Sequence, residues 1–375
     1  RPNMAGAIEA VASTSGQIMP PVLGLAAFII AVFLNIPYMD VALAGLIPAL
    51  LFLSGVTCGV LVNAYQENLP KLSETIDTEA IKRLLPAFIL SFGVVLILLL
   101  GYYSPSFAGL LGIAVALAVC PLQGKYRPTR KALFDSFSEG LALITLLSLL
   151  LIAVGPLAQT FQTTNLAQRL GVLLSQVVPD SKLLMLTGAM VVSLLLGMGL
   201  PTPVAYLVVA LSLVPFLMET GVEAIVAHFF VFYFAVFSTL TPPVAISALA
   251  AAKLSGGSFL GTCLDAMKLM LTTFIIPFAF SYHPQLLKFP NIGWDVLPPV
   301  ALIIVLQITT SIACYGYFFG QLTWIDRCMF ALLTVAGLFL LIGWSQIEFV
   351  GVTVILLITI LRFIVFKRKS SNNKV

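Results

Sequence analysis

The sequence predicts an all-α protein that crosses a lipid bilayer many times. Its 375 residues are 60% apolar and 9% charged, whereas ordinary soluble domains are about 45–50% apolar and about 25% charged. The apolar runs are continuous rather than alternating, which favours helices over a transmembrane β-barrel. Because each helical span needs about 20 residues, the chain has room for roughly ten crossings.

Apolar runs bounded by charged or turn-rich stretches define the expected helices. They lie at 4–19, 20–35, 39–64, 85–102, 105–122, 138–159, 164–179, 182–197, 260–281, 297–315, 327–344 and 346–366. A polar linker at 66–83, with a short surface helix, and a basic loop at 124–136 lie two spans apart. We therefore expect both on one face, which the positive-inside rule makes cytoplasmic.

The region 194–245 differs from the other apolar runs because it is interrupted twice. It breaks at LLLGMGLPTPVAY (194–206), turns at METGVEA (218–224) and breaks again at STLTPPVA (238–245). Irregular backbone at membrane depth is tolerated only where it is buried in protein or lines a cavity. The pattern predicts a hairpin with arms at 202–217 and 222–237, and a ligand site at the breaks.

An internal repeat links these breaks to the start of the chain. A shift of 222 residues lays GQIMPPVLGLA (16–26) over STLTPPVAISA (238–248) and matches two prolines, a valine and an alanine. Inverted repeats whose broken helices meet near the bilayer midplane are a recurring plan of secondary transporters. In the first copy we interpret 5–14 as the returning hairpin arm and expect its outgoing partner upstream of Arg1.

Three motifs in this order resemble the large membrane subunit of tripartite ATP-independent periplasmic (TRAP) transporters. They are AGAIEAVASTSGQIMPPVLGLAAFIIA (5–31), LLLGMGLPTPVAY (194–206) and FVFYFAVFSTLTPPVAISALAAAK (230–253). The resemblance covers residues 1 to about 282 and is greatest to fused permeases that work with a TAXI-type binding protein.

This resemblance implies an elevator-type, sodium-coupled importer of organic acid anions, such as C4-dicarboxylates, in the inner membrane of a bacterium or archaeon. Two hairpins and two broken helices would carry the substrate across a fixed scaffold. The implied partners are a TAXI-type periplasmic substrate-binding protein and a small four-helix membrane subunit. That subunit is expected to be fused at the N-terminus and missing from this chain. No cofactor other than coupling sodium ions and no nucleic acid is expected.

Oxygen atoms at the breaks are the predicted ligands. Sodium is a hard cation, and carbonyls freed where a helix unwinds supply oxygen without burying a full negative charge. The candidate cation- and substrate-binding residues are Ser13, Thr14, Gly16, Gln17, Gly197, Gly199, Thr202, Ser238, Thr239 and Thr241, with sodium itself expected at Gly197, Gly199, Thr202, Ser238 and Thr241. Half-helix N-termini after Pro21, Thr202 and Pro243 would offer amide groups to a substrate carboxylate.

The predicted division of the chain follows the repeat. Residues 1–64 form the remainder of the first hairpin repeat and the following span, and 65–197 form a linker with scaffold spans. Residues 198–282 form the second hairpin repeat with its broken helix, and 283–375 add extra spans and a basic tail.

Two other kinds of membrane protein remain open on the sequence alone, an ion channel and an elevator anion carrier that needs no binding protein. Broken re-entrant segments also build channel filters. A membrane enzyme would need a nucleophile with its base, a metal cluster or paired acids in one cleft. Two histidines and isolated carboxylates provide no such set, so we do not expect an enzyme.

Overall fold

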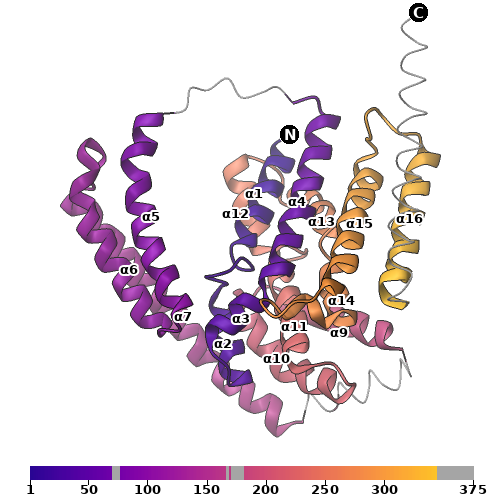
Figure 1. The fold of residues 1–375 in the computed structure, drawn as a ribbon, viewed down its shortest axis with the longest axis horizontal. Coiled ribbons are helices and arrows are strands. Elements are labelled where there is room, and N and C mark those ends of the chain that lie inside the picture. Colours follow the sequence, from indigo (N-terminus) through magenta and orange to yellow (C-terminus); the bar gives the residue numbers. More distant parts are fainter. Residues whose placement is uncertain (70–76, 166–168, 170–180, 344–375) are drawn as a thin grey trace, which may run out of the picture.

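The computed structural model describes residues 1–69, 77–165, 169 and 181–343, and over these residues its regular elements are helices (Figure 1). They are α1 (Pro2–Ser15), α2 (Leu25–Leu34), α3 (Tyr38–Ala44), α4 (Leu46–Gln66), α5 (Thr78–Leu100), α6 (Pro105–Val119), η1 (Cys120–Tyr126), α7 (Arg130–Thr163), α9 (Lys182–Gly197), α10 (Thr202–Glu219), α11 (Ala224–Ser238), α12 (Ile246–Ser255), α13 (Phe259–Leu271), α14 (Ile275–Tyr282), η2 (Pro284–Leu287), η3 (Trp294–Val296), α15 (Leu297–Tyr315) and α16 (Trp324–Gly343), where η marks a 3-10 helix.

Seven stretches of the described chain are long and apolar enough to cross a membrane, or eight if α2 and α3, bent by 113°, form one span. Fewer spans appear than the ten expected, because α9, α11 and α12 have only 16, 15 and 10 residues. Most of the predicted span 164–179, and all of 346–366, lie outside the described residues. The chain is thus a multi-pass membrane protein in which several helices end at intermediate depth.

The backbone confirms the repeat. When 222 is added to their residue numbers, the bounds of α1 and α2 agree with those of α11 and α12 to within one residue at each end. Leu23 and Ala245, which the shift equates, both have positive φ angles, of 20° and 38°. The two breaks therefore share a backbone path as well as a Pro-Pro sequence.

The two copies are inverted relative to one another. Figure 1 shows α1 descending from the upper edge to the middle of the molecule, with α2 below it, whereas α12 lies above α11. Helix α1 packs against α12, and α2 packs against α10 and α11. The first helix of each copy therefore packs against the second helix of the other copy, as expected for an inverted repeat.

Helices α9, α10 and α11 pack against one another. The predicted arms at 202–217 and 222–237 are present as α10 and α11, joined by a turn at Thr220 and Gly221. The sequence analysis did not predict that α9 and α10 form a second hairpin. Lys182, which begins α9, interacts electrostatically with Glu223, which precedes α11. Helix α10 ends at Glu219, close to Glu223, so the start of α9 lies near the end of α10. The two helices are therefore antiparallel, and 198–201 is the tip between them.

Residues 5–14 lie in α1, and α1 corresponds to α11, which is both the returning arm of the predicted hairpin and the first half of a broken helix. The interpretation of 5–14 as a returning arm therefore agrees with the backbone.

Aromatic side chains hold α11 in place. The run from Val226 to Ser238 is buried on all sides, as expected for a helix that is apolar all round. Phe230 and Phe234 pack edge-to-face on Phe278 of α14. His228 is buried with its Nδ1 2.6 Å from the hydroxyl of Tyr206, so it is a packed histidine.

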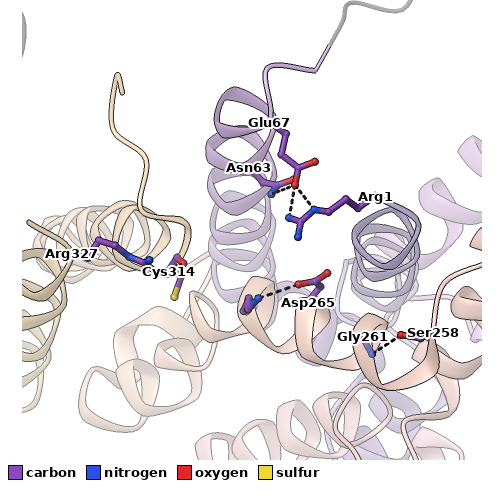
Figure 2. A network of polar contacts seen from close by, with 9 residues as sticks. Arg1, Asn63, Glu67, Ser258, Gly261, Asp265, Cys314 and Arg327 are labelled. Carbon is purple, nitrogen blue, oxygen red and sulfur yellow. Dashed lines mark hydrogen bonds and ion pairs between the residues drawn. The ribbon is translucent and has the colours of Figure 1, made fainter. Parts of the chain in front are cut away.

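A polar cluster joins α1, α4 and α13 near one end of the molecule (Figure 2). Arg1 forms an ion pair with Glu67, and its Nε donates to Glu67 Oε1 at 2.7 Å. This bond holds the pKa of the Glu67 carboxyl below its usual range. Asp265 lies on the other side of Arg1 and pairs with Lys268 at 3.2 Å.

The described part of the polar linker and the basic loop at 124–136 lie at one end of the molecule, as predicted. Lys125 of η1 pairs with Glu79 of α5 at 3.0 Å, and the Tyr126 hydroxyl donates to Asp77 at 3.0 Å. Asp77 also caps α5 by accepting a hydrogen bond from the Ala80 amide at 3.0 Å. Of the linker in which a short surface helix was expected, 70–76 lie outside the described residues, and the residues from Thr78 onward belong to α5.

Candidate functional site

The tip of the α9–α10 hairpin lies against the break between α11 and α12. A Cβ added at Gly197 would stand 2.5 Å from Ser238 Oγ and 2.9 Å from Ser238 Cβ. A Cβ added at Gly199 would stand 3.4 Å from Val244 Cγ1. Only a residue without a side chain allows the approach at Gly197, whereas the distance at Gly199 is an ordinary van der Waals contact, so Gly197 is the residue that lets the tip meet the break.

The tip presents carbonyl oxygens without protein partners. Within the described chain, no amide or side chain donates a hydrogen bond to the carbonyls of Met198, Gly199 or Leu200. Gly199 has φ +78°, a left-handed conformation that turns the chain here. Gly199 is exposed and Met198 and Leu200 are half-buried, so water reaches this tip, and a bound cation would replace water at several of these carbonyls at once.

Hydroxyl groups surround the second break. Ser238, Thr239 and Thr241 are buried, and each donates its hydroxyl proton to a carbonyl one turn back in α11, at distances of 2.7, 2.8 and 3.2 Å. A hydroxyl that donates still has two acceptor lone pairs. Thr202 is a buried residue, and its hydroxyl makes no hydrogen bond within the described residues. All four oxygens can therefore coordinate a cation.

Two helix N-termini begin beside this oxygen cluster. Helix α10 starts at Thr202 and α12 at Ile246, and neither has a side-chain cap. The amides of Thr202 and Ile246 donate to no atom of the described chain. Such free first-turn amides attract anions. Helices α2 and α12 begin at Leu25 and Ile246, a few residues after the positions expected from Pro21 and Pro243.

The first break has a backbone hydrogen bond like that of the second break, but several of its candidate residues are more exposed. The Gly24 amide donates to Gln17 O, and the Ser247 amide donates to Thr239 O, both at 3.0 Å. Thr14 is buried and donates to Ala10 O at 2.6 Å.

Other candidate residues of the first break lie nearer the surface. Ser13 and Gly16 are exposed, and the Ser13 hydroxyl donates to Glu9 at 2.8 Å. Gln17 is half-buried. No hydrogen bond in the described chain joins Ser13, Thr14, Gly16 or Gln17 to the hairpin tip. The structure thus brings the tip and the second break into contact through Gly197 and Ser238, whereas the role of the first-copy candidates stays a prediction.

Tyr38 is a structural contributor that the sequence analysis missed. Its hydroxyl lies 2.7 Å from both Pro21 O and Val22 O, so it occupies two carbonyls of the first break. Its ring stacks on Phe28 with centroids 4.0 Å apart. A tyrosine within an apolar run gives no local signal for this role.

Acidic and metal-binding side chains do not contribute to this site. Among the described residues, no group of three His, Cys, Asp or Glu side chains could hold a metal ion. Neutral carbonyl and hydroxyl oxygens suit a hard cation better than a transition metal. The described residues around the tip and the second break thus offer oxygen ligands of the kind that a hard cation prefers.

The family described as tripartite ATP-independent periplasmic transporter, DctM component, matches residues 1–290. The chain belongs to this family. A search of the curated proteins finds no match. This DctM component is a permease and not an enzyme. TRAP systems combine such a permease with a periplasmic binding protein and a small membrane subunit. The family match ends before α15, so α15 and α16 lie outside it.

Proposed function

We propose that this permease couples the entry of sodium ions to the uptake of organic acid anions, C4-dicarboxylates or related carboxylates, across the inner membrane of a bacterium or archaeon. A TAXI-type binding protein delivers the anion, and a small four-helix subunit fused N-terminally in the intact protein completes the scaffold. The chemistry of the hairpin site supports this proposal.

One observation carries it: the hairpin tip and the α11–α12 break meet through Gly197 and Ser238. Around this contact lie three tip carbonyls without protein donors and the buried hydroxyls of the break. Sodium accepts several neutral oxygen ligands, and such ligands avoid the cost of burying an unpaired charge. We assign the cation to Gly197, Gly199, Thr202, Ser238 and Thr241.

The same geometry explains why the cation and the anion would be coupled. The free amides of Thr202 and Ile246 belong to helices that start directly after the tip and the break. A cation that bridges the tip and the break fixes the distance between these two N-termini. A carboxylate that contacts both then binds more tightly, and by linkage it also tightens cation binding.

The inverted repeat supports an elevator mechanism. Helix α1 packs on α12, and α2 packs on α10 and α11, so the two copies form one interlocked body. In secondary transporters built from inverted repeats, alternating access arises when one body moves against the other around a fixed site. We propose that this interlocked body carries the anion while the remaining spans stay fixed.

Uptake by the complete system tests the proposal. The full-length permease, its small subunit and the binding protein are reconstituted in liposomes, and uptake of labelled organic acids is measured with and without a sodium gradient. We expect sodium-dependent uptake that requires the binding protein. Uptake without the binding protein would indicate an independent carrier, and a steady current without obligatory sodium would indicate a channel.

Two variants test the cation site directly. Thr202→Val and Thr241→Val each delete a hydroxyl at nearly constant volume, so we expect the sodium concentration at half-maximal uptake to rise. Thr145→Val, on the exposed surface of α7, is the matched control. Unchanged sodium activation curves in both site variants would contradict hydroxyl coordination.

A further inference from the structure

A long apolar groove lies between the hairpin arm α9 and the helices α14, α15 and α16. It consists of two adjoining cavities of about 380 and 280 Å³. Phe278, Val335 and Leu338 line both cavities, so the cavities adjoin one another. The groove therefore joins helices of the family match to helices outside it.

The occupant of this groove must be apolar. No charged side chain lines either cavity. The hydroxyls of Thr272, Thr310 and Thr334 donate to carbonyls of their own helices at 2.8, 2.7 and 3.0 Å. Because these hydroxyl protons are already engaged, the groove would donate few hydrogen bonds to a polar ligand, which would not recover the free energy of its lost hydration.

Size and surroundings favour a hydrocarbon chain. An apolar protein cavity of about 150 Å³ already accommodates benzene, and the larger cavity here has more than twice that volume. Helices α15 and α16 belong to stretches that are long and apolar enough to cross a membrane, where acyl chains are the surrounding solvent. The groove is elongated along α16, from Ala331 to Ile342, which matches the shape of a single acyl chain.

A lysine stands at one end of the groove. Leu183 and Ile342 line that end, and Lys182 directly precedes Leu183. Lys182 Nζ donates to Ser281 O at 2.5 Å and lies 4.7 Å from the centre of the Tyr282 ring.

Other charged groups lie near this end. Glu223 attracts Lys182 electrostatically and also pairs with Lys288 at 3.9 Å, so its single negative charge is shared between two lysines. His283 Nε2 lies 2.8 Å from Leu341 O and joins the end of α14 to α16. A cation at the open end of an apolar groove matches the phosphate of a lipid headgroup.

We propose that this groove binds one acyl chain of an anionic phospholipid, with the headgroup phosphate at Lys182. The bound lipid ties the hairpin arm α9, through Met190 and Thr187, to α16. It thereby gives α15 and α16 a role in supporting the transport hairpin.

Photo-cross-linking tests the acyl-chain site in the intact permease complex. The probe is a phosphatidylglycerol that carries a diazirine midway along one acyl chain, in nanodiscs, with cross-linked peptides identified by mass spectrometry. We expect cross-links to α9, α14 and α16 at the groove. Ala331→Phe fills the groove and should reduce them at least fivefold. Ala336→Phe, on the same helix but outside the lining, is the matched control and should not.

A second substitution guards against misfolding of the first. Ala313→Phe fills the groove from α15, and thermal unfolding of each variant shows whether it is folded. Equal cross-linking at the groove in folded Ala331→Phe, folded Ala313→Phe and the Ala336→Phe control would overturn the proposal. An efficient disulfide between Ala331→Cys and a cysteine placed in 346–366 would also overturn it, because this chain itself would then fill the groove.

The headgroup contact has its own measurement. Native mass spectrometry compares the retention of palmitoyl-oleoyl phosphatidylglycerol with that of palmitoyl-oleoyl phosphatidylcholine. We expect at least a threefold preference for the anionic lipid, and Lys182→Gln should remove it. The same preference in Lys182→Gln would refute the assignment of the phosphate to Lys182.

Discussion

The contact between Gly197 and Ser238 allows the sharpest test of the site. Gly197→Ala adds a methyl group that would stand 2.5 Å from Ser238 Oγ and 2.9 Å from Ser238 Cβ. Ser238 is fully buried, and its hydroxyl donates to Ala235 O at 2.7 Å, so it has little room to move away. The hairpin tip must therefore shift relative to the break.

The magnitude follows from overpacking. Forcing an extra methyl into a well-packed interior costs about 1–3 kcal/mol. Alanine is favoured over glycine in a helix by about 1 kcal/mol, but Gly197 is the last residue of α9, so this gain is realised only in part. If the cost acts on the cation-bound geometry, a coupling of 1–3 kcal/mol corresponds to about 5–150-fold weaker sodium binding.

The assay is sodium-dependent uptake by the reconstituted complex, together with sodium-induced thermal stabilisation of the purified permease. We expect Gly197→Ala to raise the sodium concentration at half-maximal uptake at least fivefold. Gly93→Ala in α5 is the control, since no atom lies within 4 Å of its added methyl. An unchanged sodium curve in folded Gly197→Ala would refute the contact as the cation site.

Two further predictions concern stability. Tyr38→Phe removes the hydroxyl that contacts two carbonyls of the first break, and the loss of about 1–3 kcal/mol should lower the thermal unfolding temperature. The same unfolding temperature in both proteins would contradict this role. Glu67→Gln tests the ion pair with Arg1: because that bond lowers the Glu67 pKa, its stabilisation is present above the ordinary glutamate pKa of about 4.3 and is lost as the pH falls through the lowered value. Thermal unfolding from pH 7 to 3 should bring the two proteins together at acidic pH, and a constant difference would contradict the assignment.

Much of the helical pattern was predictable because length and hydrophobicity determine spans in a bilayer. The span expected at 297–315 matches α15, which prolines open and Gly316 ends in a left-handed conformation. The breaks at 16–22 and 238–245 were predictable as well, since two consecutive prolines cannot continue a helix. The repeat in sequence therefore translated directly into a repeat in backbone.

The reversal of the chain at 198–201 was not predictable from local sequence. Glycine and proline accompany a kinked helix and a hairpin tip alike. The contact that decides between them joins Gly197 to Ser238, 41 positions later. The Tyr38 contact depends in the same way on tertiary packing, because nothing near Tyr38 in sequence indicates which carbonyls its hydroxyl meets.

The repeat also implies that its two breaks cannot hold a cation equally well. The shift of 222 residues equates Gly16 with Ser238 and Met19 with Thr241, so hydroxyls of the second break have no counterpart in the first. Gly16 is exposed, whereas Ser238 is fully buried. A cation at the first break would have the hydroxyls of Ser13, which is exposed, and Thr14 one turn earlier, and it would exchange its ligands with solvent more readily. The backbone symmetry of the fold thus supports two sites of different strength, and the stronger one lies where the hairpin tip covers the hydroxyls.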